Sequence, residues 1–153
     1  TESSIGDQML RTLIEAICNG VKLTNLNLRL WKNPKVSGEF LEKIEGLALQ
    51  TKLKTFNLEL SDCSFQKNNL IPYLEIMLRN AISVSNLGLT LRRNEITFEQ
   101  ANEIVRLVKN MEWLKEIEID MKENSVEAHQ SAQLEVELAS SIKLSSYNLE
   151  FAT

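Results

Sequence analysis

Histidine and cysteine, two side chains that commonly carry catalysis, are scarce in this sequence. Its 153 residues include one histidine, His129, and two cysteines, Cys18 and Cys63. They contain no Gly-rich phosphate loop, no C-x-x-C pair, no H-E-x-x-H motif and no G-x-S-x-G nucleophile elbow. A histidine-dependent triad would have to form around His129, for which we find no partner residue. We therefore expect no enzyme, no cofactor and no bound metal. His129 is interpreted as a solvent-facing helix residue, with a pH-sensing or ligand role as the alternative.

The sequence also lacks an excess of basic residues and a long apolar run. Its 17 Lys and Arg against 21 Asp and Glu give a net charge of −4. Proteins that bind nucleic acid or anionic membranes normally show a basic face, so we expect neither partner. No apolar run reaches the length of a membrane span, and no signal-peptide pattern opens the chain. Both cysteines are interpreted as buried reduced thiols, which favours the cytoplasm or another reducing compartment.

One phrase, repeated five times, dominates what remains. Each copy has apolar residues at its first, fourth, sixth and eighth positions, as in Leu23, Leu26, Leu28 and Leu30. The starts are spaced 30, 31, 30 and 30 residues apart, and a fixed period of this size indicates a repeat protein. The five copies begin at Leu23, Leu53, Val84, Leu114 and Leu144.

The phrase predicts a strand followed by a turn. From its fourth position apolar and polar residues alternate, which is typical of a strand with one buried face. An Asn or Cys follows the eighth position by three residues, at Asn33, Cys63, Asn94 and Asn124. A buried Asn there would hydrogen-bond the neighbouring turn, with Cys as a small, weakly polar substitute. A doubly wound α/β sheet is the alternative, but it requires neither similar strands nor a shared turn residue.

Apolar residues at helical spacing predict a helix between successive phrases. The clearest helix begins at a capping box formed by Thr97 and Gln100. The least clear spans 125–140, because residues 133–138 alternate like a strand. Trp113, just before the fourth phrase, is expected in the core. The remaining helices are expected over 4–19, from about 37 to 47, and from about 69 with Pro72 in the first turn.

The phrase L-x-x-L-x-L-x-L-x-x-N, followed by a helix, resembles the ribonuclease-inhibitor-like leucine-rich repeats, and most of all the repeat arrays of ciliated protists. Residues 23–33 are the best match, and Ser4–Asp7 resembles the helix start after the Asn of such arrays. The resemblance covers nearly the whole chain. It implies an α/β leucine-rich-repeat solenoid over residues 1–153, right-handed, with parallel strands on the concave face and helices on the convex face. It implies little about function.

The polar positions of the strands predict a binding surface on the concave face. Glu116, Glu118 and Asp120 form an acidic column there, too widely spaced for one metal ion to be held by all three. We expect a protein partner to lay a basic segment on it; the alternative is that the acidic residues only keep the sheet soluble. Trp31 is either a hot-spot residue or packing at the edge of the array. The candidate binding residues are Arg29, Trp31, Glu59, Arg92, Glu116, Glu118, Asp120 and Glu150.

Three hypotheses for function follow from the repeats. The first is a protein–protein interaction scaffold with a rigid concave surface. The second is a regulatory or targeting segment of a larger protein that contains an enzyme, and the third is a building block of a ciliary or cytoskeletal assembly. Neither end of the pattern shows a clear capping repeat, so we expect a segment of a longer chain or a short array stabilised by a partner. Open sheet edges at the ends would allow self-association.

Overall fold

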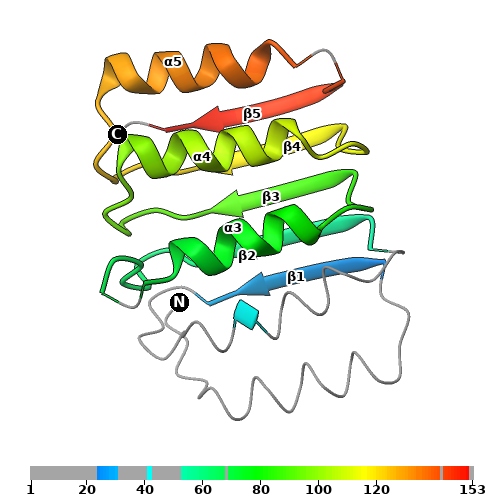
Figure 1. Ribbon diagram of the computed structural model, residues 1–153, viewed down its shortest axis with the longest axis horizontal. Coiled ribbons are helices and arrows are strands. Elements are labelled where there is room, and N and C mark those ends of the chain that lie inside the picture. The colour runs from blue at the N-terminus through cyan, green and yellow to red at the C-terminus, as the bar shows by residue number, and fades with distance from the viewer. Residues whose placement is uncertain (1–23, 31–40, 43–52, 68, 142, 152–153) are drawn as a thin grey trace.

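Strands and helices alternate along the chain (Figure 1). The structure, a computed structural model, describes residues 24–30, 41–42, 53–67, 69–141 and 143–151. Its strands are β1 (Asn25–Arg29), β2 (Thr55–Glu59), β3 (Asn86–Thr90), β4 (Glu116–Asp120) and β5 (Ser146–Glu150). Its helices are α3 (Ile71–Asn80), α4 (Phe98–Lys109) and α5 (Ala128–Ala139). The helix expected over 4–19 lies outside the described residues, and so does the one expected over 37–47 apart from helical Leu41 and Glu42.

The five strands form one parallel sheet in the order β1-β2-β3-β4-β5. Equivalent positions of successive phrases are paired, which confirms the register that the alternation predicts. One buried-face column runs through Leu28, Leu58, Leu89, Ile119 and Leu149. Leu58, Leu89 and Ile119 in the middle of this column are almost fully buried. The sheet is therefore held together by stacked apolar side chains as well as by the ladder of backbone hydrogen bonds.

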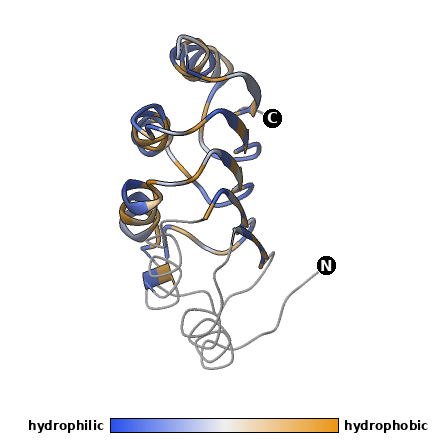
Figure 2. Cartoon of the chain, turned by 90° about the vertical axis from the view of Figure 1, so that its right-hand side faces the viewer, coloured by the Kyte–Doolittle hydropathy of each residue, from blue (hydrophilic) through white to orange (hydrophobic). Residues whose placement is uncertain are grey.

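The helices cover one face of the sheet, so the molecule has two layers (Figure 2). Each helix turns a stripe of apolar residues towards the strands because these residues recur every three or four positions. Leu74 of α3, Ile104 of α4 and Leu134 of α5 occupy equivalent places and are all buried. The core lies between the layers, and the other face of the sheet is left for solvent.

Local sequence explains where the helices begin. Pro72 lies in the first turn of α3, where a backbone N–H would have no partner within the helix, so proline costs no helical hydrogen bond there. The predicted box of Thr97 and Gln100 starts α4, with both reciprocal hydrogen bonds formed. The segment that alternates like a strand is helical in α5, which begins at Ala128 after Glu127. The helix succeeds there because Leu134 and Leu138, four residues apart, both reach the core.

The turns after β2, β3 and β4 are joined by a ladder of side chains, which we call the turn ladder: Cys63, Asn94 and Asn124. The carboxamide oxygen of Asn94 accepts a hydrogen bond from the Cys63 N–H at 2.8 Å, and its nitrogen donates to the carbonyl of Leu60. Asn124 makes the same pair of hydrogen bonds in the turn after β4: its side-chain oxygen accepts from the Asn94 N–H at 2.8 Å, and its nitrogen donates to the carbonyl of Leu91. The Cys63 thiol reaches the carbonyl of Leu30 at 3.1 Å. The expected function of the turn Asn and Cys is confirmed.

The expectation that Trp113 belongs to the core is wrong, since 59% of this residue is exposed. It stands in the loop between α4 and β4, outside the alternating stretch, so the strand pattern does not fix which way its side chain points.

Among the helices of the described residues, none combines the length and the apolar composition that a membrane span needs.

Candidate interaction surface

The sheet face away from the helices carries the polar positions of all five strands, and we call it the polar sheet face. Its rows follow the register: Arg29, Glu59, Thr90, Asp120 and Glu150 form one, and Asn27, Asn57, Gly88, Glu118 and Asn148 another. The third row consists of Asn25, Thr55, Asn86, Glu116 and Ser146. The structure thus brings together seven of the eight candidate binding residues on or beside one face, whereas Trp31 lies outside the described residues. Ser61, which the alternation places on this face, is buried instead and accepts a hydrogen bond from the Arg92 N–H.

Two adjoining hollows lie on the polar sheet face, and we call them the Gly88 hollows because Gly88 lines the first of them. One has a volume of about 260 Å³ and the other about 280 Å³, and both are bordered by Asn57 and Glu118. A Cβ atom at position 88 would lie 2.3 Å from the Asn57 side-chain oxygen, so a larger residue could not be accommodated without moving Asn57. A glycine inside a strand often marks such a close approach. The glycine in the third strand phrase is the sequence signal for a hollow here, and the alternation of apolar and polar residues alone does not predict one.

Asp120 is not the exposed, uncompensated carboxylate that the acidic column predicts. Its side chain is only 13% exposed and forms an ion pair with Arg92, whose Nε donates to Oδ2 at 2.6 Å. That hydrogen bond also raises the pKa of the Arg92 guanidinium. The other Asp120 oxygen accepts from the Lys122 N–H, and the Lys122 ammonium lies 2.9 Å from Glu150. Pairing across neighbouring strands therefore neutralises one end of the expected acidic patch.

Glu116 and Glu118 carry charges that no described side chain compensates. Both side chains are exposed, and in the described part of the chain neither makes an ion pair or a hydrogen bond. They lie on the same side of β4, two residues apart and therefore about 7 Å from each other along the strand. The acidic part of the polar sheet face is thus a pair of carboxylates beside the Gly88 hollows and not a column of three.

The other chemistry considered from the sequence does not assemble on this surface. Among the described residues there is no group of three or more His, Cys, Asp or Glu side chains that could hold a metal ion. His129 is exposed on α5, with its Nδ1 3.4 Å from the neighbouring Glu127 carboxylate. Cys63 is buried within the turn ladder.

Two solved structures have a similar fold. The actin-binding site 2 of leiomodin-1 superposes with a TM-score of 0.64 at 19% identity, covering 97% of this chain and 81% of that one. The tropomodulin C-terminal domain of Caenorhabditis elegans superposes with a TM-score of 0.56 at 16% identity, covering 97% of this chain and 85% of that one. No family model and no curated protein matches the sequence.

These structures correct the resemblance drawn from the repeated phrase. The ribonuclease-inhibitor-like repeats of ciliated protists are the wrong relatives, because the similar folds belong to leiomodin and tropomodulin. The phrase misleads for a physical reason: a parallel sheet with one buried face favours alternating apolar residues, and a buried turn favours an Asn that can hydrogen-bond its neighbour, whatever the ancestry of the chain. The described part of the chain is an α/β fold with five parallel strands in one sheet, and it shares this fold with the two solved structures.

Proposed function

We propose that this domain is a protein-interaction module of the actin cytoskeleton and that it binds through the polar sheet face. The observation that carries the proposal is the free pair Glu116 and Glu118 beside the Gly88 hollows. The leiomodin-1 domain of the same fold is named for an actin-binding site, which supports actin as the first partner to test. The proposed role is binding and not catalysis.

The repeated units support a rigid platform for this role. We infer that units of about 30 residues stack as a right-handed leucine-rich-repeat solenoid, with the polar sheet face on its concave side and the helices outside. Side chains on such a sheet are held in place before a partner arrives, so little conformational entropy is lost on binding. A basic segment laid across β4 would meet both carboxylates, and a basic side chain could enter the hollow above Gly88.

Charge reversal tests the proposed surface. Purified actin, as monomer and as filament, is mixed with the full 153-residue chain, and binding is measured by sedimentation and by fluorescence anisotropy at several salt concentrations. Glu116→Lys with Glu118→Lys should weaken binding roughly tenfold or more at low salt and flatten its salt dependence. Asp120 is left unchanged because its replacement would remove the ion-pair partner of the Arg92 guanidinium.

The matched control changes the same net charge on the helix layer. Glu99 of α4 and Glu135 of α5 are exposed, so Glu99→Lys with Glu135→Lys should bind as the unaltered chain does. If both double variants lose affinity equally, the effect is one of net charge and the polar sheet face is not the site. If the unaltered chain binds neither form of actin, actin is the wrong partner.

A second candidate function, self-association, has its own supporting observation. Beside β5, the last strand of the described sheet, Tyr147 is 53% exposed and Val136 of α5 is 70% exposed. An apolar surface next to an unpaired strand edge favours pairing with another chain. Analytical ultracentrifugation should show self-association that Tyr147→Lys with Val136→Lys abolishes; a monomer at all concentrations would refute it.

A further inference from the structure

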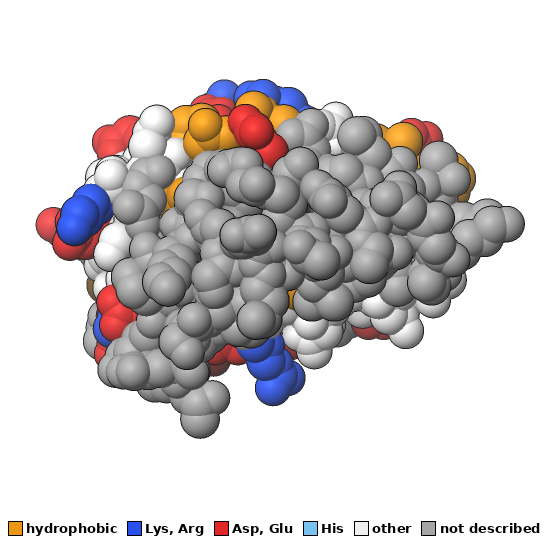
Figure 3. All heavy atoms as spheres, turned by 90° about the horizontal axis from the view of Figure 1, so that it is seen from below, with side chains coloured by type: hydrophobic (Ala, Val, Ile, Leu, Met, Phe, Trp, Pro, Cys, Tyr) orange, Lys and Arg blue, Asp and Glu red, His pale blue; other side chains and the backbone are white. Residues whose placement is uncertain are grey.

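A cleft of about 490 Å³ opens at the edge of the molecule where the helices lead into the strands, well away from the turn ladder. We call it the indole cleft, since Trp113 forms one of its walls. Ile82, which is 58% exposed, also lines it. In Figure 3 hydrophobic side chains reach the surface along the upper rim and at the upper right, where an acidic side chain lies beside them, whereas the left-hand edge shows charged side chains of both signs. The described lining residues that matter here are Arg79, Ala81, Ile82, Met111, Glu112 and Trp113.

The next unit along the stack shows what such a position normally does. Lys143 stands 30 residues after Trp113, in the corresponding place before the next strand. Its ammonium donates hydrogen bonds to the carbonyls of Lys109 and Met111 at the C-terminal end of α4. A cation is favoured there because the C-terminal end of a helix carries partial negative charge. Lys143, which precedes β5, thus caps the C-terminal end of α4, the helix that precedes β4.

Trp113 breaks this arrangement at the end of α3. The carbonyls that correspond to those of Lys109 and Met111 are those of Arg79 and Ala81, and both residues line the indole cleft. The indole takes the place of the lysine and makes no hydrogen bond in the described part of the chain. The C-terminal end of α3 therefore keeps its negative character beside an aromatic ring, with the Glu112 carboxylate at the same cleft.

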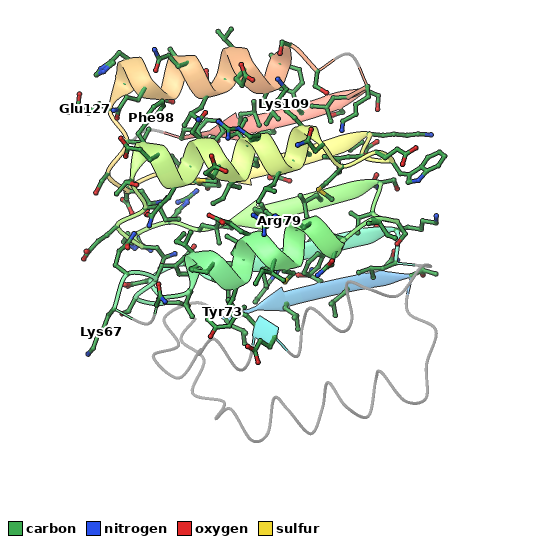
Figure 4. The ribbon with its side chains drawn as sticks, in the orientation of Figure 1. Lys67, Tyr73, Arg79, Phe98, Lys109 and Glu127 are labelled. Carbon is green, nitrogen blue, oxygen red and sulfur yellow. The ribbon has the colours of Figure 1, made fainter. Side chains whose placement is uncertain are left out.

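We propose that the indole cleft binds a lysine or arginine side chain of a partner protein, as a second contact separate from the polar sheet face. The side chain would lie against the Trp113 ring and place its charge on the Arg79 and Ala81 carbonyls, as Lys143 does on those of Lys109 and Met111. The Arg79 guanidinium lies 3.9 Å from the Glu75 carboxylate, just as its counterpart Lys109 in α4 lies 2.7 Å from Glu137, so each of these charges already has a partner. Figure 4 shows Arg79 and Lys109 towards the C-terminal ends of their helices.

The proposal is tested with two blocked peptides and the full chain. Acetyl-Gly-Lys-Gly-amide supplies the cation, and the same peptide with norleucine in place of lysine supplies an uncharged side chain of similar shape. Binding is followed by the NMR shift of the Trp113 indole N–H, which the spectrum of Trp113→Phe assigns. The lysine peptide should shift this signal saturably and with roughly tenfold higher affinity than the norleucine peptide.

A variant built from the chain's own template serves as the decisive control. Trp113→Lys should fill the site with an internal ammonium and abolish the lysine-peptide shifts of the Ile82 and Ala81 amides, while Glu112→Gln should weaken them. Glu116→Lys with Glu118→Lys should leave them unchanged, which separates this cleft from the polar sheet face. The proposal is overturned if the norleucine peptide binds as well as the lysine peptide, if Trp113→Lys leaves the shifts intact, or if the indole signal does not move.

Discussion

The two ends of the parallel strands differ in how far their side chains repeat, and we call the side where the strands end the repeated edge and the side where they begin the variable edge. At the edge after the strands, equivalent positions hold Cys63, Asn94 and Asn124, which bind the backbone of the neighbouring turn. At the edge before the strands, equivalent positions hold Ser83, Trp113 and Lys143, each with a different environment. The position after the strands thus repeats one structural contact, whereas the position before them makes a different contact in each copy.

The largest effect should come from the core that both edges share. Leu58 is buried at the centre of its column, so Leu58→Ala should remove apolar contacts and leave a cavity, at a cost of about 2–5 kcal/mol in the free energy of unfolding. Chemical denaturation monitored by circular dichroism measures it. A loss below ~0.5 kcal/mol would show that the stacked column does not hold the units together.

The turn ladder should give the next largest effect. Asn94→Ala removes the acceptor of the Cys63 N–H and the donor to Leu60, leaving buried backbone groups unpaired, so it should cost about 1–3 kcal/mol. Asn94→Cys should recover part of this loss, because Cys63 already stands at the equivalent position of the previous turn. Equal stability of all three proteins would mean that the ladder is incidental to the fold.

The two edges also differ in how far the sequence predicts them. The strands, their register and the turn ladder could be derived because alternation and a fixed period determine which side chains face inward. The start of α4 could be derived because its capping box is local, and α5 because the repeat frame places a helix there and Leu134 and Leu138 are compatible with one helix face.

Features that depend on contacts between units were harder to derive. Asp120 and Arg92 are 28 residues apart in the chain, and only the strand register brings them together to remove a charge from the acidic column. Trp113 lies outside the alternating phrase, so its hydrophobicity suggested burial. A signal was present: Lys22, Lys52 and Lys143 occupy the same place before other phrases, and lysine at equivalent positions indicates a surface site.

At the variable edge, Lys143→Met should have a smaller effect than a change in the turn ladder. The variant loses two hydrogen bonds to the end of α4 but is relieved of a partly buried charge, so the net cost at neutral pH should be about 0.5–1 kcal/mol. Thermal and urea unfolding measure it. A cost equal to that of Asn94→Ala would remove the distinction between the edges.

The pH dependence of this lysine has a definite sign. Burial, and then the charge of Lys109, lower the pKa of the Lys143 ammonium below its usual value. Between the folded and unfolded pKa values the unfolded chain binds more protons, so stability should rise with pH in that alkaline window. Lys143→Met should lack this part of the rise. If the two proteins have parallel pH profiles, Lys143 is not desolvated in the folded state.

The smallest effect should come from the exposed pair that links α4 and α5. The hydrogen bond from Lys109 lowers the pKa of Glu137, so this carboxylate adds stability above its unfolded pKa and loses it as pH falls through the folded value. Glu137→Gln should therefore flatten the stability profile slightly between about pH 3 and pH 6. A steeper profile in the variant would contradict the assignment.

The central claim is that the repeated edge stabilises the fold more than the variable edge does, and one paired measurement tests it most directly. The free energies of unfolding of Asn94→Ala and Trp113→Lys are determined by urea denaturation in the same chain under the same conditions. We expect Asn94→Ala to lose about 1–3 kcal/mol. Trp113→Lys should stay within about 0.5 kcal/mol of the unaltered protein, because a lysine there can cap α3 as Lys143 caps α4. A loss in Trp113→Lys as large as that in Asn94→Ala would contradict the claim.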